Sequence, residues 1–448
     1  MNIEDDSALA IITPVEEDID EMSEEELEAL AEAEAKEIEE RAEIMQTLAN
    51  SIESKFLHRC GQRASKESQW LESARLYYGK LAISDYITKG ETPWEGRHTS
   101  ERPDINIVRS KCSIAIAQTV SMQFGTSNKN WDIFPSKDDP APENVVSCGL
   151  MSDVMETQLD QSKYSLQCRK AMVDRVVIGT GILKGPLSTG RLTRAYDKLD
   201  GTNTWVPTVS VDYAPVLERI NPWFFYPDET QECTDALEDS IETHPMSALE
   251  LKKLMKHEGF RADAIAEVLE QAPQEYRSTT WADFAKMSEN NPNLYKNKYL
   301  VLEYHGPITK TQLAKLELEP AYDSINEEYY GEVWVCQGKV IRIELEAIEA
   351  SFRIPYYICN WEKDPASVFG FGVPLMMADA QRVVNESWHM ILDNSSMSSG
   401  PQVAMQKNLI EPANGKWELN PGQIWYLTDP QANIQNAIQF FNVPNVSD

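Results

Sequence analysis

The chain has 448 residues, 42% hydrophobic and 25% charged, an ordinary composition for a soluble globular protein of roughly three domains. Its charge is unusual, because 41 Lys and Arg face 72 Asp and Glu, a formal net charge of −31. This excess excludes a basic coat that binds nucleic acid by neutralising phosphates, and it argues against docking on an anionic membrane. About half of it lies in residues 1–50, which hold 18 acidic and 2 basic residues.

The cysteines and the hydropathy of the chain narrow the class of protein further. The seven cysteines are scattered without a CxxC pair, which predicts free thiols in a reducing compartment. The acidic N-terminus does not fit a secretory signal, and no apolar run approaches the roughly 18 residues of a membrane span.

The first part of the chain is predicted to be helical. Residues 1–22 are acidic without an apolar period, which predicts a disordered tail. An acidic helical arm follows over 23–60, and Ser23 with Glu26 forms a capping box at its start. Apolar spacing then predicts four more helices, over 65–88, 105–124, 142–162 and 164–177.

Beyond residue 180 the pattern changes to strands, and the whole predicts an α+β fold. Gln337-Gly338 is typical of a tight hairpin, and a last long helix is expected from Pro374 to Asn394. Strands are predicted over 182–186, 204–212, 214–220, 299–305, 332–337, 339–345 and 353–361, with a helix over 248–272, and short strands over 402–406, 416–419 and 423–427.

The sequence motifs that could indicate catalysis or ligand binding are weak. The glycines of Gly179 to Gly185 suggest a phosphate loop, but a helix precedes them, so a helix-to-strand turn is favoured. Lys184 and the nearby Arg191, Arg194 and Lys198 are interpreted as a mixed surface. The six histidines show no metal-ligand spacing, although a site built from residues distant in sequence stays open. We therefore predict no catalytic, cofactor-binding or metal-binding residue and no enzymatic activity.

Several segments, taken in order, resemble phage portal proteins of the podophage and siphophage type. Trp70 to Gly79 is similar to their W…Y-x-G opening, and 219–228 is similar to a stretch that precedes a helix. The strongest similarity is Pro365 to Pro374, followed by Asp379, Gln381 and Asn385, which resembles the family pattern fG-x-g-x-P…D-x-Q…N. Weaker similarities are Asn106 to Ser110 with Phe134-Pro135, Gly400 to Val403, and Asn420 to Ile424.

The resemblance implies a ring-forming α+β subunit, typically in a dodecamer, with a wing over 61–365, a stem helix within 366–399, and a small α/β clip that leads into a second stem segment over 400–448. A portal continues into a tunnel loop and a crown, so a chain that stops at Asp448 is expected to be a fragment or to lack that part. Implied stem and oligomer residues are Gly370, Gly372, Pro374, Asp379, Gln381, Asn385 and Trp388, and implied clip residues are Trp417, Gly422 and Trp425.

By the same resemblance, the ring sits at the capsid vertex of the virion after assembly in the host cytoplasm. It acts as the conduit for double-stranded DNA during packaging and ejection. Its implied partners are further copies of itself, the major capsid protein, the terminase and a tail adaptor, with no membrane in the mature ring. Two alternatives stay open: an acidic virion assembly or adaptor protein, and a carboxylate-rich, metal-dependent hydrolase.

Overall fold

The computed structural model describes most of the chain. The predicted disordered tail 1–22 and Gly422 lie outside the described residues. Those residues are 24–80, 104–125, 133–135, 142–198, 205–228, 237–257, 259–273, 283–285, 297–316, 318, 328–345, 354–398, 402–417, 423–428 and 437–441.

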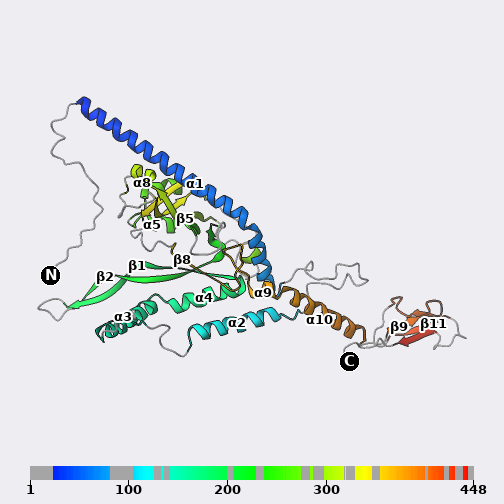
Figure 1. Cartoon of the computed structure of the whole chain (residues 1–448). Helices are drawn as coiled ribbons and strands as arrows, with labels where there is room; N and C mark the ends of the chain where they lie inside the picture. The colour runs from blue at the N-terminus through cyan, green and yellow to red at the C-terminus, as the bar shows by residue number, and fades with distance from the viewer. Residues whose placement is uncertain are drawn as a thin grey trace.

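The molecule is elongated and of mixed α and β structure (Figure 1). The helix α1, Glu24–Tyr78, runs along one side of a body of two sheets and several helices, and its first turns project beyond that body. At the other end, α10 leaves the body and leads to a small group of strands far from both sheets (Figure 1). We call these strands the terminal β module: β9 (Gln402–Met405), β10 (Ile410–Pro412), β11 (Trp425–Leu427) and β12 (Ile438–Phe441).

The larger sheet is antiparallel, in the order β3-β4-β5-β6-β7. Its strands are β3 (Phe225–Pro227), β4 (Ser240–Met246), β5 (Tyr299–Thr309), β6 (Glu328–Cys336) and β7 (Lys339–Leu345). Leu302 and Val333 on one face pack against Leu48 and Ile52 of α1. The opposite face packs against α5 (Ala248–Leu254) and α6 (Ala262–Glu270), while α8 (Lys310–Leu316) follows β5. The strands therefore alternate between two covered faces.

The smaller sheet has the order β2-β1-β8 and is dominated by a long ribbon. Its strands are β1 (Thr180–Lys198), β2 (Trp205–Ile220) and β8 (Tyr356–Asn360). Helix α4 packs on the ribbon, α2 lies along α4, and α3 contacts β2 and α4 (Figure 1). These helices are α2 (Ile107–Gln123), α3 (Pro142–Gln161) and α4 (Tyr164–Val177), and the short η3 (Pro222–Phe224) joins the two sheets.

The structure corrects three boundaries. The predicted helices 23–60 and 65–88 form one helix, so the expected boundary between arm and wing falls inside α1. Arg63 lies where a break was expected, and its guanidinium donates to the carbonyls of Trp223 and Phe225 at 2.8 and 2.6 Å. Buried carbonyls need hydrogen-bond partners, and Arg63 is the partner here. These bonds hold this part of α1 in place, so the helix continues through it.

The predicted helix 248–272 is also wrong, because a turn around His257 separates α5 from α6. The predicted helix from Pro374 is divided at Met377 into α9 (Val373–Met376) and α10 (Ala378–Ser398). The predicted strand 416–419 is absent from its described part, residues 416–417. The helix-to-strand turn at Gly179 and the hairpin at Gln337-Gly338 are confirmed, and both hairpin residues have positive φ.

Glycines allow the start of β1 to touch the segment before α9. A Cβ on Gly179, which has φ +107°, would lie 2.5 Å from the carbonyl carbon of Phe371. A Cβ on Gly372 would lie 2.5 Å from the carbonyl oxygen of Val177. Gly370 is equally close to the Glu362 carbonyl oxygen, at 2.4 Å. Gly370 and Gly372, which the resemblance assigns to the stem, are thus in close contact with backbone of the same chain.

We expect Gly372→Ala to lower the free energy of unfolding by about 1–3 kcal/mol, because the added methyl group meets backbone atoms that cannot rotate away. Gly61→Ala is the matched control, since no atom lies within 4 Å of its Cβ position inside α1. It should stabilise the protein by up to about 1 kcal/mol. Urea unfolding followed by circular dichroism measures both, and equal effects would contradict the contact.

Candidate functional site

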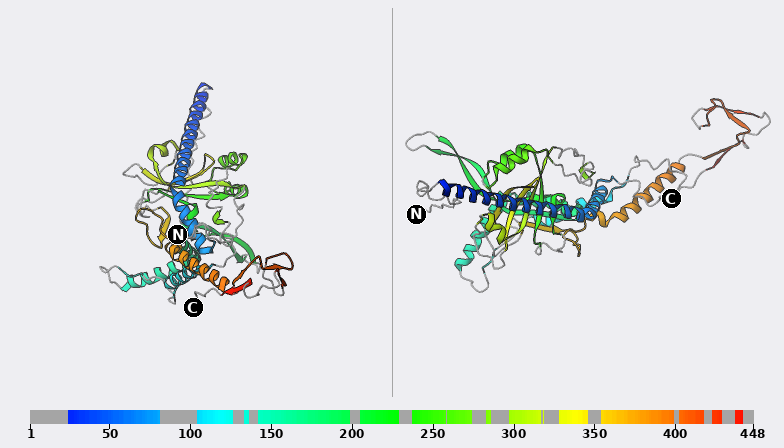
Figure 2. Two further views of the ribbon diagram at one scale, coloured as in Figure 1. Left: turned by 90° about the vertical axis from the view of Figure 1, so that its right-hand side faces the viewer. Right: turned by 90° about the horizontal axis from the view of Figure 1, so that it is seen from above.

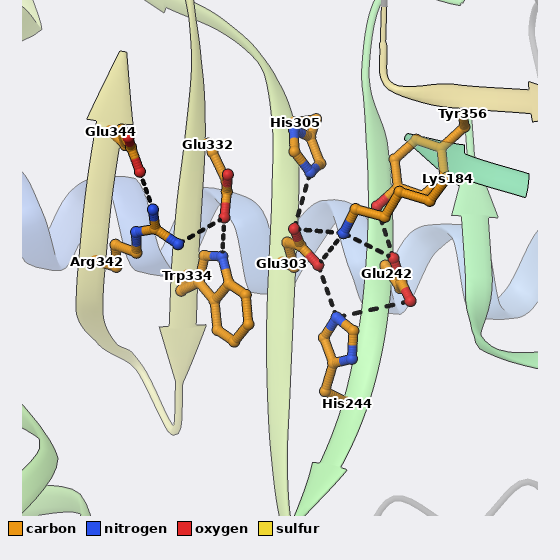
Figure 3. Close-up of polar contacts among 10 residues, drawn as sticks. All are labelled: Lys184, Glu242, His244, Glu303, His305, Glu332, Trp334, Arg342, Glu344 and Tyr356. Carbon is orange, nitrogen blue, oxygen red and sulfur yellow. Dashed lines mark hydrogen bonds and ion pairs between the residues drawn. The ribbon is translucent and has the colours of Figure 1, made fainter. Parts of the chain in front are cut away.

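A row of charged and aromatic side chains crosses the larger sheet on the face opposite α1 (Figure 3). Because side chains alternate along a strand, Glu242 and His244 of β4 share this face. In the sheet register, Glu242 pairs with Glu303 of β5, which brings the two carboxylates together. His305 follows Glu303 on the same face of β5.

The charge of this row is balanced from the other sheet. Lys184 of β1 places its Nζ 2.6 Å from both carboxylate oxygens of Glu303 and 3.1 Å from Oε2 of Glu242. All three ammonium protons are therefore used. The side chains of Lys184, Glu242 and Glu303 are 7%, 6% and 2% exposed, so this ion pair network is buried between the two sheets.

Three more groups complete the network, which we call the junction cluster: Lys184, Glu242, His244, Glu303, His305 and Tyr356 (Figure 3). Nε2 of His244 and of His305 lie 2.7 and 3.0 Å from the two oxygens of Glu303. The Tyr356 hydroxyl donates to Glu242 at 2.8 Å. Both carboxylates are thus multiply hydrogen-bonded, as buried charges require.

The environment shifts the pKa values of the cluster. Burial alone would raise the pKa of Glu303, but the two histidines and the Lys184 charge hold it well below its ordinary value. Burial alone would lower the pKa of His244, but its hydrogen bond to Glu303 and the charge of Glu242 raise it. With His244 protonated, two positive charges balance the two carboxylates.

We tested whether the cluster fits a metal ion. The ligand atoms of Glu242, His244 and Glu303 lie within 4.8 Å of one another, and so do those of Glu303, His305 and Glu332. However, the Lys184 ammonium already lies between the two carboxylates, and the histidine protons occupy the remaining lone pairs of Glu303. A metal would have to displace these groups, so the donor set fits an ion pair junction better than a metal centre.

The interpretation of Lys184 as part of a mixed surface is wrong, since its side chain is buried in the junction cluster. The sequence does contain a signal for this site that we did not use. Glu242-Thr243-His244 and Glu303-Tyr304-His305 are two Glu-x-His pairs in strands, and a period of two places both members on one face.

The residues expected in a stem divide between the inside and the surface of the folded chain. Gln381 accepts from the backbone N–H groups of Ile107 and Val108 at 3.0 and 3.2 Å, so it caps the start of α2. Its amide also donates to Asn385 at 2.8 Å. Pro374 is buried, Asp379 is exposed beside Arg382, and Trp388 is half-buried.

The helix α10 has a polar inner face, and its outer face carries exposed apolar side chains beside the exposed Asp379 and Ser387. Gln381, Asn385 and His389, spaced four apart, are 3%, 0% and 6% exposed. Nε2 of His389 lies 3.0 Å from Oδ1 of Asp104. On the outside, Val383, Met390 and Ile391 are 54%, 61% and 43% exposed. This reverses the usual amphipathic pattern, so α10 is no ordinary core helix.

The terminal β module also leaves aromatic side chains in solvent. It consists of two separate two-stranded ladders, β9–β12 and β10–β11. Trp417 and Trp425 contact each other with ring centroids 5.7 Å apart, and Trp417 remains 46% exposed. Tyr426, Phe440 and Phe441 are exposed as well. Figure 1 places the terminal β module away from both sheets of the body.

No family model matches the chain, and no curated protein matches it. Among the described helices, none combines the length and the apolar character needed to cross a membrane.

We expect Lys184→Met to lower the free energy of unfolding by about 3–5 kcal/mol at neutral pH, because it leaves two buried carboxylates without their cation. The loss should shrink as the pH falls, since the carboxylates can then take up protons. Urea unfolding of Lys184→Met and of Lys184→Met/Glu303→Gln provides the test. The double variant removes one buried charge and should recover part of the loss, and a single variant as stable as wild type would contradict the junction.

The pKa directions predict a pH dependence of stability. The raised pKa of His244 means that its contribution is present below its ordinary value of 6.5 and is lost as the pH rises through the higher folded value. The lowered pKa of Glu303 means that its contribution is present above 4.5 and is lost as the pH falls through the lower folded value. Relative to His244→Gln, the wild type should therefore gain most stability at or below about pH 6.5 and lose this advantage above it. A difference that grows with pH in urea titrations would oppose this assignment.

Proposed function

We propose that this protein is a subunit of a phage portal ring, the conduit through which DNA is packaged and ejected. In this proposal the two-sheet body is the wing, α10 is the stem helix that lines the conduit with its copies, and the terminal β module is the clip. The ring is dodecameric and sits at the capsid vertex, in contact with the major capsid protein.

The reversed pattern of α10 carries the proposal. A helix that extends from the body with Val383, Met390 and Ile391 in solvent exposes apolar area that a monomer does not cover. Its inner face is occupied by the hydrogen bonds of Gln381 to residues 105–108 and by the approach of His389 to Asp104, so the helix has no means of turning its apolar side inward. Identical neighbours around a ring supply the missing contact for every copy at once.

The charge of the chain fits a passage for DNA. Duplex DNA carries about one negative charge per 1.7 Å of its axis. A basic wall would bind this charge and slow the duplex, whereas an acidic wall keeps it centred and mobile. The residues beyond 50 carry 54 acidic and 39 basic side chains, from the totals of 72 and 41 less the 18 and 2 of residues 1–50, a net of −15.

The terminal β module is suited to successive partners. Isolated two-stranded ladders are marginal in water, so the module gains stability when strands of a neighbouring copy extend it. Exposed aromatic side chains such as Trp417 and Tyr426 are typical anchors of protein interfaces. We propose that this face binds the terminase during packaging and a tail adaptor afterwards.

The junction cluster does not support the hydrolase alternative. Its carboxylates are at most 6% exposed and are held by Lys184, the two histidines and Tyr356, which leaves little of them open to a substrate. The portal and the assembly-protein hypotheses are distinguished by particle shape. Negative-stain images of the purified chain should show rings with a central hole, whereas compact monomers or elongated rods would refute the portal hypothesis.

We expect Val383→Asp to shift the purified protein from rings to monomers, since it places a charge in the apolar face of α10. Trp388→Asp should act in the same direction. Leu57→Asp is the matched control, because Leu57 is an exposed side chain of α1, and a single exposed leucine is normal for a monomer surface. Light scattering reports the mass of each variant. A monomeric wild type, or rings that survive Val383→Asp, would exclude α10 as the stem.

A further inference from the structure

A second apolar face lies on α3. Val146, Leu150 and Val154 are spaced four residues apart and are 64%, 64% and 56% exposed. At 100° per residue, this ridge points away from Ser152, the buried residue of α3. The helix contacts β2 and α4 of its own chain, and the ridge stays uncovered.

Shape and charge distinguish this helix from the others. In both views of Figure 2, α3 leaves the body sideways, so its ridge can reach a neighbouring molecule. The helix contains four acidic residues, Glu143, Asp153, Glu156 and Asp160, and no basic residue. Glu143 lies on the ridge side, one turn before Val146, and Asp153 borders the ridge.

The outer face of α4 has the same form and the opposite charge. Leu166 and Val173 are 49% and 39% exposed and lie seven residues apart, two turns along one side. Between them, Arg169 and Lys170 are exposed. The long side chains of such residues cover apolar surface with their methylene groups while their charges stay in water.

We infer that the α3 ridge of one subunit packs against the α4 face of the next copy in the ring. This inference rests on the proposed function and names the contact by which its wings join. The ridge of α3 and the apolar pair of α4 both suit helix-on-helix packing. The acidic border of one then meets the basic border of the other.

The difference between the α3 ridge and the α4 face indicates which molecule binds the ridge. A face that met its own copy would place acidic α3 against acidic α3, which costs energy. Two different faces that complement each other make a head-to-tail contact, and such contacts continue from copy to copy until a ring closes. A second copy of this chain supplies the complementary face in the required number.

The test compares two valines on opposite sides of α3. Val154→Asp places a charge on the ridge, whereas Val145→Asp is the matched control, because Val145 is similarly exposed, at 54%, but points away from the ridge. We expect Val154→Asp to raise the concentration at which half of the chains are assembled by about tenfold or more, and Val145→Asp to leave it within about twofold. Mass photometry over a dilution series measures assembly, and thermal unfolding checks that both variants fold.

The outcomes separate the two proposals. Rings that assemble equally well with Val154→Asp would overturn the α3 contact and leave the portal proposal intact. A wild type that stays monomeric at every concentration would overturn both.

A charge exchange identifies the partner face. Glu143→Lys/Asp153→Lys and Arg169→Glu/Lys170→Glu should each weaken assembly, because like charges then meet at the contact. All four substitutions in one chain should restore assembly toward the wild-type concentration, since opposite charges face each other again. If the combined variant is weaker than either pair, α4 is not the face that α3 meets.

Discussion

One 55-residue helix contributes to three separate hydrophobic cores, and the placement of the other elements depends on it. Ile52 packs on the larger sheet, Trp70 on the core of the smaller sheet, and Leu76 on the core shared by α2, α4 and α10. Between the first two, Arg63 is buried and donates to the carbonyls of the chain that links the sheets. Loss of this helix would remove the only element common to all three cores among the described residues.

Beside its hydrophobic cores, the protein uses buried polar contacts to join some of its elements, and it leaves apolar side chains on its surface. Lys184 and Glu303 join the two sheets, and Gln381 joins α10 to α2. Such contacts are directional, so they fix orientation more strictly than hydrophobic packing does. Meanwhile α10, α3 and the terminal β module keep large apolar side chains in solvent. A subunit with a strictly oriented interior and uncovered apolar edges is suited to a repeating assembly.

A helix or strand can be predicted from the sequence when neighbouring residues set its limits. It is missed when residues far away in the chain set them. The helix Tyr164–Val177 and the strand Lys339–Leu345 were predicted with their observed bounds, because their periodicity and flanking turns are local. The continuity of α1 was missed, since Arg63 is held by carbonyls about 160 residues away. The junction cluster was missed for the same reason: Lys184 and Glu303 are 119 residues apart.

The α+β class, the acidic charge and the hairpin at Gln337-Gly338 could be predicted from the sequence, since composition and turn residues are properties of the chain alone. Only the tertiary structure decided which side of each helix faces inward. The pattern of α10 marked several apolar positions, but whether Val383 is core or surface depends on what lies beside it, and Asp104 and Ile107 occupy the inner side. Likewise, the Lys184 side chain is a buried counter-ion because the larger sheet covers it. The strands of that sheet are far apart in the sequence, so the residues around Lys184 do not reveal this burial.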